Sequence, residues 1–162
     1  MTIARYGRPY LDSSVYIAAI KDEENRALVV RQILEAAEKR EIQIVASTFV
    51  AAEVIRMKGE SLPLSSEKES EIDDLLKSER ILWVELDLTV ALEARKLARV
   101  HGLKPADAVH LASAIRAKAD VLFRYDDRFA SANEVAGLAL CEPFWFGDAS
   151  FPELVVEESP TK

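Results

Sequence analysis

The stretch YLDSSV at residues 10–15 places a carboxylate where a short apolar strand ends. Residues 8–11 predict that strand, and residues 15–20 predict a short helical segment after it. Asp12 lies between them. It is either the N-cap of the helical segment, a position that aspartate favours, or a functional residue at the edge of a sheet. The stretch alone does not decide between the two, so the rest of the sequence must.

Short apolar strands alternate with helical patterns along the chain. Strands are expected at residues 8–11, 42–46, 81–86, 120–123 and 137–140. Two helices are expected in the first part of the chain, one from residue 22 to about 40 and one from a Ser47-Thr48 cap to near Gly59. A third is expected to begin at a capping box formed by Ser66 and Glu69. A fourth is expected from an Asp87 cap to Gly102, and a fifth after Pro105. This alternation is typical of βαβ units. It predicts an α/β fold with a mostly parallel central sheet of four to five strands, covered by helices on both faces.

The 162 residues are expected to form one domain over residues 1–147, followed by an acidic tail over residues 148–162. No apolar run of about 18 residues is present, so neither a membrane span nor membrane attachment is expected. The basic N-terminal residues have no apolar segment behind them and do not resemble a secretory signal. The single cysteine, Cys141, cannot form an internal disulfide, and a reducing cytoplasm is the expected location.

The formal net charge of −7 argues weakly against nucleic-acid binding through bulk charge, because phosphate contacts need lysine and arginine. It does not exclude a nuclease, since bound cations reverse the local sign of a carboxylate site. A basic partner chain would balance the same surface. One helix carries a basic stripe, which either follows an RNA backbone or is a solvated helix face. Its residues are Arg95, Lys96, Arg99 and Lys104.

Three further acids occupy positions comparable to that of Asp12. Asp126 follows the fourth predicted strand, and Glu53 lies early in the helix after the second. Asp107 lies in the first turn of the helix that precedes the fourth strand. Helices in this architecture begin at the edge where the strands end, and ligands bind at that edge. We therefore expect all four acids to reach one cleft.

Four carboxylates in one cleft predict a metal site. Like charges a few ångströms apart repel, so one group must take up a proton or a cation must lie between them. Oxygen ligands suit Mg²⁺ or Mn²⁺, whereas Zn²⁺ favours His and Cys, and the two histidines are not spaced for zinc. Such an ion can activate water against a phosphodiester. Taken singly, each acid also has a structural explanation, as a helix cap, a first-turn acid or a surface residue.

Four stretches resemble PIN-domain ribonucleases, and look most like the VapC-type toxins of bacterial and archaeal toxin–antitoxin pairs. They are YLDSSV at 10–15, STFVAAEV at 47–54, PADAVHLASA at 105–114 and YDDRF at 125–129. The third stretch nearly matches the family's typical motif. The four stretches keep the family's order and rough spacing over about residues 9–140. One departure is Arg124, which stands where the family usually has a threonine or serine.

The resemblance implies a three-layer α/β/α sandwich, Mg²⁺ or Mn²⁺ as cofactor, and endonucleolytic cleavage of RNA. By its motifs, Asp12 and Asp107 are the expected metal ligands. Glu53 and Asp126 would complete the catalytic cluster. A cognate antitoxin and a second copy of the chain are the expected protein partners. The residues expected to bind substrate are Ser13, Ser14 and Arg128.

Two questions stay open at the level of sequence. His110 lies one helical turn after Asp107, and it is either a buried histidine between helix and sheet, which we favour, or a proton carrier or substrate contact. The alternative function is a catalytically inactive RNA-binding or assembly module, and Arg124 favours it. A phosphatase of the haloacid dehalogenase type ranks last. It needs a second aspartate where this chain has Ser14.

Overall fold

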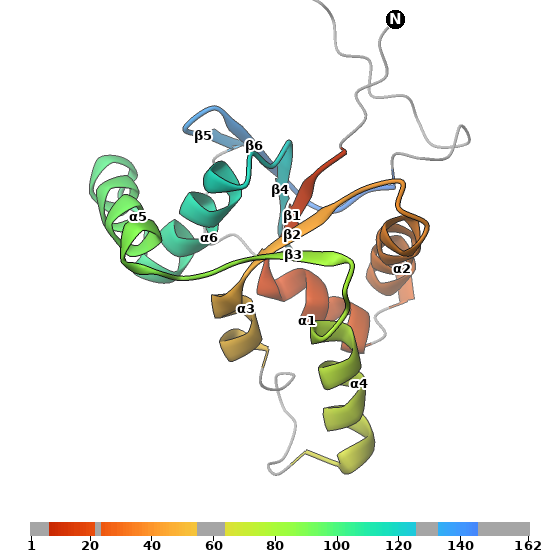
Figure 1. Cartoon of the computed structure of the whole chain (residues 1–162). Coiled ribbons are helices and arrows are strands. Elements are labelled where there is room, and N and C mark those ends of the chain that lie inside the picture. The colour runs from red at the N-terminus through yellow and green to blue at the C-terminus, as the bar shows by residue number, and fades with distance from the viewer. Residues whose placement is uncertain (1–6, 22–23, 55–63, 126–132, 146–162) are drawn as a thin grey trace, which may run out of the picture.

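Six strands form one sheet at the centre of the computed structural model, which describes residues 7–21, 24–54, 64–125 and 133–145 (Figure 1). The strands are β1 Pro9–Leu11, β2 Ile44–Ser47, β3 Ile81–Val84, β4 Val121–Phe123, β5 Glu134–Val135 and β6 Leu138–Cys141. The helices are α1 Ser13–Lys21, α2 Glu24–Glu38, α3 Thr48–Glu53, α4 Ser66–Leu76, α5 Leu88–His101 and α6 Pro105–Arg116. Strands and helices therefore alternate as the sequence predicted.

The strand order is β3-β2-β1-β4-β6-β5, and all neighbours pair in parallel except β5 and β6. From β1 the chain adds β2 and β3 on one side, and then continues with β4 on the other. The strand order therefore reverses between β1 and β4, and ligands of such sheets bind at the carboxyl ends beside this switch point. Asp12 lies there, and its backbone N–H donates to the Phe123 carbonyl at 3.1 Å.

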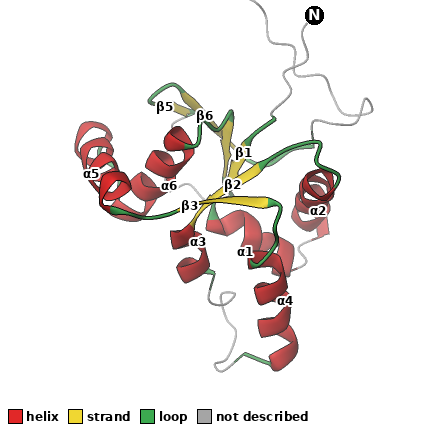
Figure 2. Cartoon of the chain, in the orientation of Figure 1, coloured by secondary structure: helices red, strands yellow, loops and turns green. Residues whose placement is uncertain are grey.

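Side chains alternate between the two faces of the sheet, as the pleat requires. Leu11 and Phe123 pack on one face with residues of α1, α2, α3 and α4. Tyr10 and Leu122 pack on the other face with α6, and α5 lies against α6 (Figure 2). The predicted three-layer sandwich with a mostly parallel sheet is confirmed. Five of the described strands are parallel, and the sixth is the two-residue β5, which the prediction of four to five strands did not include.

The predicted capping box of α4 is wrong by one residue. Ser65, not Ser66, has the extended cap conformation, and its Oγ accepts from the Lys68 N–H at 3.3 Å. Ser66 is the first helical residue, so Glu69 does not occupy the third helical position that a capping box needs. Ser65 and Ser66 have the same side chain, so either could cap the helix by residue type. Only the backbone conformation shows that Ser65 is the cap.

The helix expected to run to near Gly59 ends at Glu53. Val54 still donates to the Val50 carbonyl, but its ψ of 72° takes the chain out of the helix. Residues 55–63, where the prediction placed the end, lie outside the described residues. The consequence for the site is that Glu53 lies at the end of a short helix instead of within the first turns of a longer one.

α5 begins and ends where the sequence predicted, and α6 begins where it predicted. The Asp87 carboxylate accepts from the Val90 N–H at 2.8 Å and caps α5. Gly102 follows α5 with φ 66°, a conformation that glycine adopts without strain. Pro105 opens α6 at its first position, and the helix leads back toward β4. The first turn of α6 therefore lies at the edge where the strands end.

The last described segment packs against the core. The Phe144 ring meets Phe123 edge-on with 5.5 Å between centroids, and Trp83 and Trp145 pack against the same cluster. Both tryptophans therefore contribute to the packing around the core. The predicted domain boundary at residue 147 and the tail over residues 148–162 lie outside the described residues. Within the described ranges, no helix is long and apolar enough to cross a membrane.

Candidate active site

Asp12 is fully buried at the carboxyl end of β1. Its Oδ1 accepts from the Ser14 N–H at 2.6 Å and from the Ser13 hydroxyl at 3.2 Å. Its Oδ2 is buried and has no hydrogen-bond partner among the residues that the structure describes. Asp12 therefore caps α1 through one oxygen, and the cap leaves the burial of the other oxygen unexplained. Burying an ionised carboxylate oxygen is costly unless a positive charge or a donor compensates it.

Ser14 joins two segments of the site. Its backbone N–H holds Asp12, and its Oγ accepts from the Tyr125 N–H at 3.0 Å. Tyr125 follows β4 and precedes Asp126, so this contact ties the end of β4 to the start of α1. Asp126 and Arg128 themselves lie beyond residue 125, in a segment outside the described residues. Their assignment to the site, and that of Ser13 and Ser14 to substrate binding, stays a prediction.

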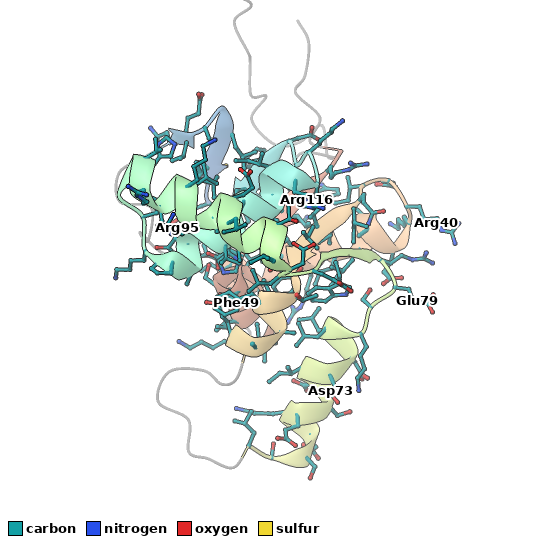
Figure 3. The ribbon with its side chains drawn as sticks, turned by 60° about the vertical axis from the view of Figure 1, so that its left-hand side comes forward. Arg40, Phe49, Asp73, Glu79, Arg95 and Arg116 are labelled. Atoms are coloured by element: carbon teal, nitrogen blue, oxygen red, sulfur yellow. The ribbon has the colours of Figure 1, made fainter. Side chains whose placement is uncertain are left out.

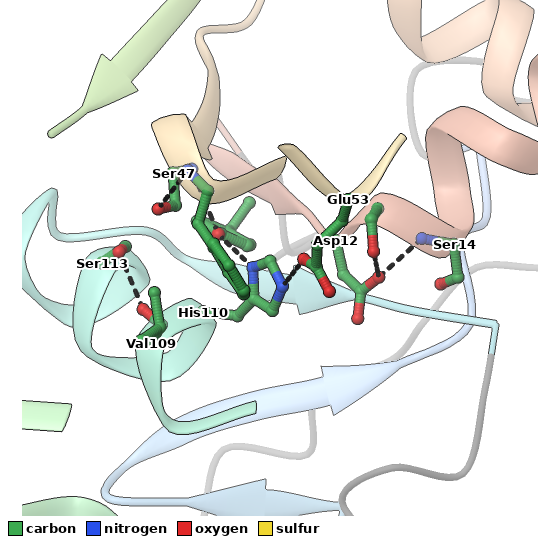
Figure 4. A network of polar contacts seen from close by, with 10 residues as sticks. Asp12, Ser14, Ser47, Glu53, Val109, His110 and Ser113 are labelled. Atoms are coloured by element: carbon green, nitrogen blue, oxygen red, sulfur yellow. Dashed lines mark hydrogen bonds and ion pairs between the residues drawn. The ribbon is translucent and has the colours of Figure 1, made fainter. Parts of the chain in front are cut away.

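Glu53 meets His110 across the site. Glu53 Oε1 lies 2.5 Å from the His110 Nε2, and the His110 Nδ1 lies 2.7 Å from the Tyr10 hydroxyl (Figure 4). The Tyr10 oxygen also accepts from the Ser47 N–H at 3.1 Å. His110 is fully buried, as the favoured interpretation held, but it also contacts a candidate acid. Sequence reasoning missed Tyr10 and Ser47. The available signal was that Tyr10 precedes Asp12 by two residues and so shares its face of the strand.

The carboxylates of Asp12 and Glu53 both act on the Tyr10 phenol. Burial raises the pKa of Tyr10 well above its ordinary range, and the charges of Asp12 and Glu53 raise it further, against the opposing Ser47 N–H. Tyr10 therefore remains a neutral hydroxyl at physiological pH. Figure 4 shows the two carboxylates pointing into the same region beyond the end of β1, which agrees with their shared effect on this phenol.

Asp107 lies in the first turn of α6 and is 1% exposed. The positive end of the helix dipole favours a carboxylate at this position. His110 lies one turn further along the same helix face, and its contacts with Tyr10 and Glu53 join α6 to β1 and α3. The elements that carry Asp12, Glu53 and Asp107 therefore meet at one edge of the sheet, and it stays a prediction that the four acids share one cleft.

The described residues do not contain a complete metal site. Among them, no group of three or more His, Cys, Asp or Glu side chains is placed to hold a metal ion. The fourth predicted acid, Asp126, lies outside the described residues, so the predicted set of four is not tested. The observation that fits a divalent cation is the buried Oδ2 of Asp12, and hard oxygen donors suit Mg²⁺ or Mn²⁺. Asp12 and Asp107 are the residues that would hold it.

Arg124 follows β4 and is 7% exposed, so a cation is buried at the strand end where a hydroxyl was expected. Its backbone N–H donates to the Cys141 carbonyl at 3.0 Å. Burial raises the pKa of the Cys141 thiol to about 11, against the opposing charge of Arg124. Cys141 is therefore a protonated thiol at physiological pH and not a nucleophile.

Several basic side chains lie on α5 and α6. Figure 3 shows Arg95 and Arg116 over these helices, and Asp73 away from them on α4. The four residues of the basic stripe, Arg95, Lys96, Arg99 and Lys104, are all exposed. Their exposure is compatible with both interpretations of the basic stripe, as a surface that follows an RNA backbone or as a solvated helix face.

Comparison with known proteins adds three structural neighbours and one family. The PIN domain family model matches residues 10–135. VapBC2 from Rickettsia felis, bound to a DNA fragment from its promoter, is similar with TM-score 0.60 and 17% identity over 83% of this chain and 98% of that chain. VapC20 of Mycobacterium tuberculosis, a sarcin–ricin loop cleaving toxin, has TM-score 0.58 and 13% identity over 78% of this chain and 96% of that chain. A toxin–antitoxin complex from Klebsiella pneumoniae has TM-score 0.58 and 18% identity over 84% of this chain and 98% of that chain. No curated protein sequence matches the chain.

Proposed function

The chain belongs to the PIN-domain family, and from this premise we propose that it is a metal-dependent endoribonuclease and the toxin of a toxin–antitoxin pair. The observation that carries the proposal is the Asp12 carboxylate. It is fully buried at the switch point of the sheet, and its Oδ2 has no hydrogen-bond partner in the described part of the chain. A divalent cation at this oxygen would offset the cost of burying the charge.

Bound Mg²⁺ or Mn²⁺ would supply an activated water and stabilise the charge that develops on the phosphodiester. The protein's own residues orient the ligands. Ser13 and Ser14 fix Oδ1 of Asp12, so the direction of Oδ2 is fixed as well. Asp107 is the proposed second ligand, and Glu53 and Asp126 complete the catalytic cluster. Substrate phosphates would meet the residues proposed to bind RNA, which are Ser13, Ser14 and Arg128.

The proposed partners follow from the likeness to VapC proteins and from the charge of the chain. One similar structure is a toxin–antitoxin complex, and another is a toxin that cleaves the sarcin–ricin loop. We extend to this chain an RNA substrate, a cognate antitoxin, a homodimer and a cytoplasmic location. The net charge of −7 suits a partner with a basic surface. The nuclease domain is assigned to residues 1–147 and the acidic tail to residues 148–162.

A catalytically inactive RNA-binding or assembly module is the second candidate. The observation that favours it is Arg124, a buried cation at the carboxyl end of β4. A guanidinium at this edge can balance carboxylate charge that a metal would otherwise balance. In that case the chain would keep the fold and its surfaces, and would neither bind Mn²⁺ nor cleave RNA.

Removal of the metal tests the proposal. Purified chain is incubated with structured RNA in Mn²⁺ or Mg²⁺, and the same reaction is run with EDTA. EDTA is expected to slow cleavage by at least about 10²-fold, because charge stabilisation at the phosphodiester is lost, and excess Mn²⁺ should restore the rate. Cleavage that is equally fast in EDTA rejects the metal-dependent mechanism. Absence of both cleavage and Mn²⁺ binding favours the inactive module.

A further inference from the structure

Four buried or partly buried residues form one continuous set of hydrogen bonds, here called the buried network: Ser47, Tyr10, His110 and Glu53. The Ser47 N–H donates to the Tyr10 oxygen at 3.1 Å, the Tyr10 oxygen lies 2.7 Å from His110 Nδ1, and His110 Nε2 lies 2.5 Å from Glu53 Oε1 (Figure 4). We infer that Tyr10 and His110 are positioning residues that hold the Glu53 carboxylate at the active site. This inference rests on the proposed function.

The donors and acceptors of the buried network have one self-consistent direction. A backbone N–H can only donate, so the Tyr10 oxygen accepts from Ser47. The single hydroxyl proton of Tyr10 then has His110 Nδ1 as its acceptor. A neutral imidazole that accepts at Nδ1 carries its proton on Nε2, and this N–H donates to the carboxylate of Glu53. Every hydrogen bond in the set is satisfied in this direction.

The reverse direction leaves a buried donor without an acceptor. If Nδ1 carried the proton, the Tyr10 oxygen would accept twice and its own hydroxyl proton would have no acceptor within the network. Tyr10, His110 and Ser47 are each 0% exposed, so that proton does not face bulk solvent. An unsatisfied buried donor is strongly disfavoured. The geometry therefore selects the Nε2–H tautomer.

Glu53 lies at the C-terminal end of a short helix. α3 has six residues, Glu53 is the last of them, and Val54 has already left the helical conformation. His110, in contrast, is held by packing. Its ring meets the rings of Tyr10 and Phe49, each with 5.8 Å between centroids. A donor on α6 that is held by packing thus contacts a carboxylate at the end of a short helix.

The buried network also joins the elements that carry the other acids. Tyr10 lies on β1 two residues before Asp12, and His110 lies on α6 three residues after Asp107. Ser47 caps α3, the helix that ends with Glu53. A displacement of one element is therefore transmitted to the others through hydrogen bonds, and the spacing of the three acids depends on Tyr10 and His110.

The tautomer of His110 is the first test, and it does not require metal or RNA. The full-length chain is labelled with ¹⁵N, and ring nitrogen–proton correlations are recorded at neutral pH. The chain has two histidines, so His101→Gln assigns the remaining signal to His110. The expected pattern is that of the Nε2–H tautomer. The Nδ1–H pattern in the wild-type chain would overturn the inference, whether or not the chain is a nuclease.

A matched pair of amide variants is the second test. In His110→Gln the side-chain amide reaches the place of the imidazole Nε2, whereas the shorter amide of His110→Asn reaches only the place of Nδ1. Loss of a contact that orients a residue at a metal site typically costs about 10–100-fold in metal affinity or activity. His110→Asn should lose that factor in Mn²⁺ affinity and in kcat, with KM for RNA unchanged. His110→Gln keeps a donor to Glu53 and loses only the acceptor for the Tyr10 hydroxyl, so its loss should be smaller than that of His110→Asn.

Thermal unfolding of both variants separates positioning from folding. Comparable Tm values with different Mn²⁺ affinities support the inference. Equal losses in the two variants would contradict a role through Nε2. If the wild-type chain binds no Mn²⁺, the proposed function fails, and the tautomer measurement alone then decides whether the buried network is oriented as inferred.

Discussion

Replacing Asp12 with asparagine is expected to lower kcat for RNA cleavage by about 10²–10³-fold, the usual cost of removing one charge-stabilising group. Asparagine has the same shape, and its Oδ1 can still accept from the Ser14 N–H and cap α1. It removes the negative charge at Oδ2, the buried oxygen without a hydrogen-bond partner among the described residues. The loss should therefore appear in metal affinity and kcat and not in folding. Single-turnover cleavage at several Mn²⁺ concentrations measures both.

Asp74→Asn is the matched control. It makes the same change of charge and shape on α4, where Asp74 is exposed. This variant should cleave RNA at the wild-type rate. Wild-type cleavage by Asp12→Asn would remove Asp12 from the metal site and leave it as a helix cap only.

Replacing Phe123 with alanine is expected to lower the free energy of unfolding by about 3–5 kcal/mol, the usual range for a buried phenylalanine. Phe123 is 0% exposed and lies on β4, which pairs with β1 on one side and β6 on the other. Its ring also packs on Phe144. The truncation leaves a cavity in the middle of the sheet, beside the switch point. Urea unfolding followed by circular dichroism measures the loss.

Leu82→Ala serves as the control for Phe123→Ala. Leu82 lies on β3 at the edge of the sheet and is 42% exposed, so its truncation should change the free energy of unfolding by only about 0.5 kcal/mol. Equal losses in the two variants would show that β4 does not lie at the centre of the core.

Local signals in the sequence were enough to predict most of the fold. Residues 121–123 are apolar without a break because β4 is covered on both faces, and that pattern is visible without a structure. The Asp87 cap and the Gly102 stop act within one helical turn, so they too were predicted correctly. β5 was missed. It has two residues and exists only through its pairing with β6, which no local pattern reports.

The acids were easier to predict than the groups that hold them. Asp12 follows a strand end and Asp107 a helix start, positions that the sequence marks, and both side chains are buried, while their role in the site stays a prediction. The partners of His110 lie 57 and 100 residues away in the chain. Which side chain His110 meets depends on how α6 packs against the sheet. The sequence therefore predicted its burial correctly and did not reveal the buried network.

Location of the metal ion tests the central claim most directly. Crystals of the full-length chain are soaked in Mn²⁺, and diffraction is measured near the manganese absorption edge. The account predicts an anomalous peak at the carboxyl edge of β1, within coordination distance of Asp12 Oδ2 and of the Asp107 carboxylate, and no peak there in Asp12→Asn crystals. No peak at this edge in the wild-type chain, or an unchanged peak in Asp12→Asn, would contradict the metal-dependent site proposed here.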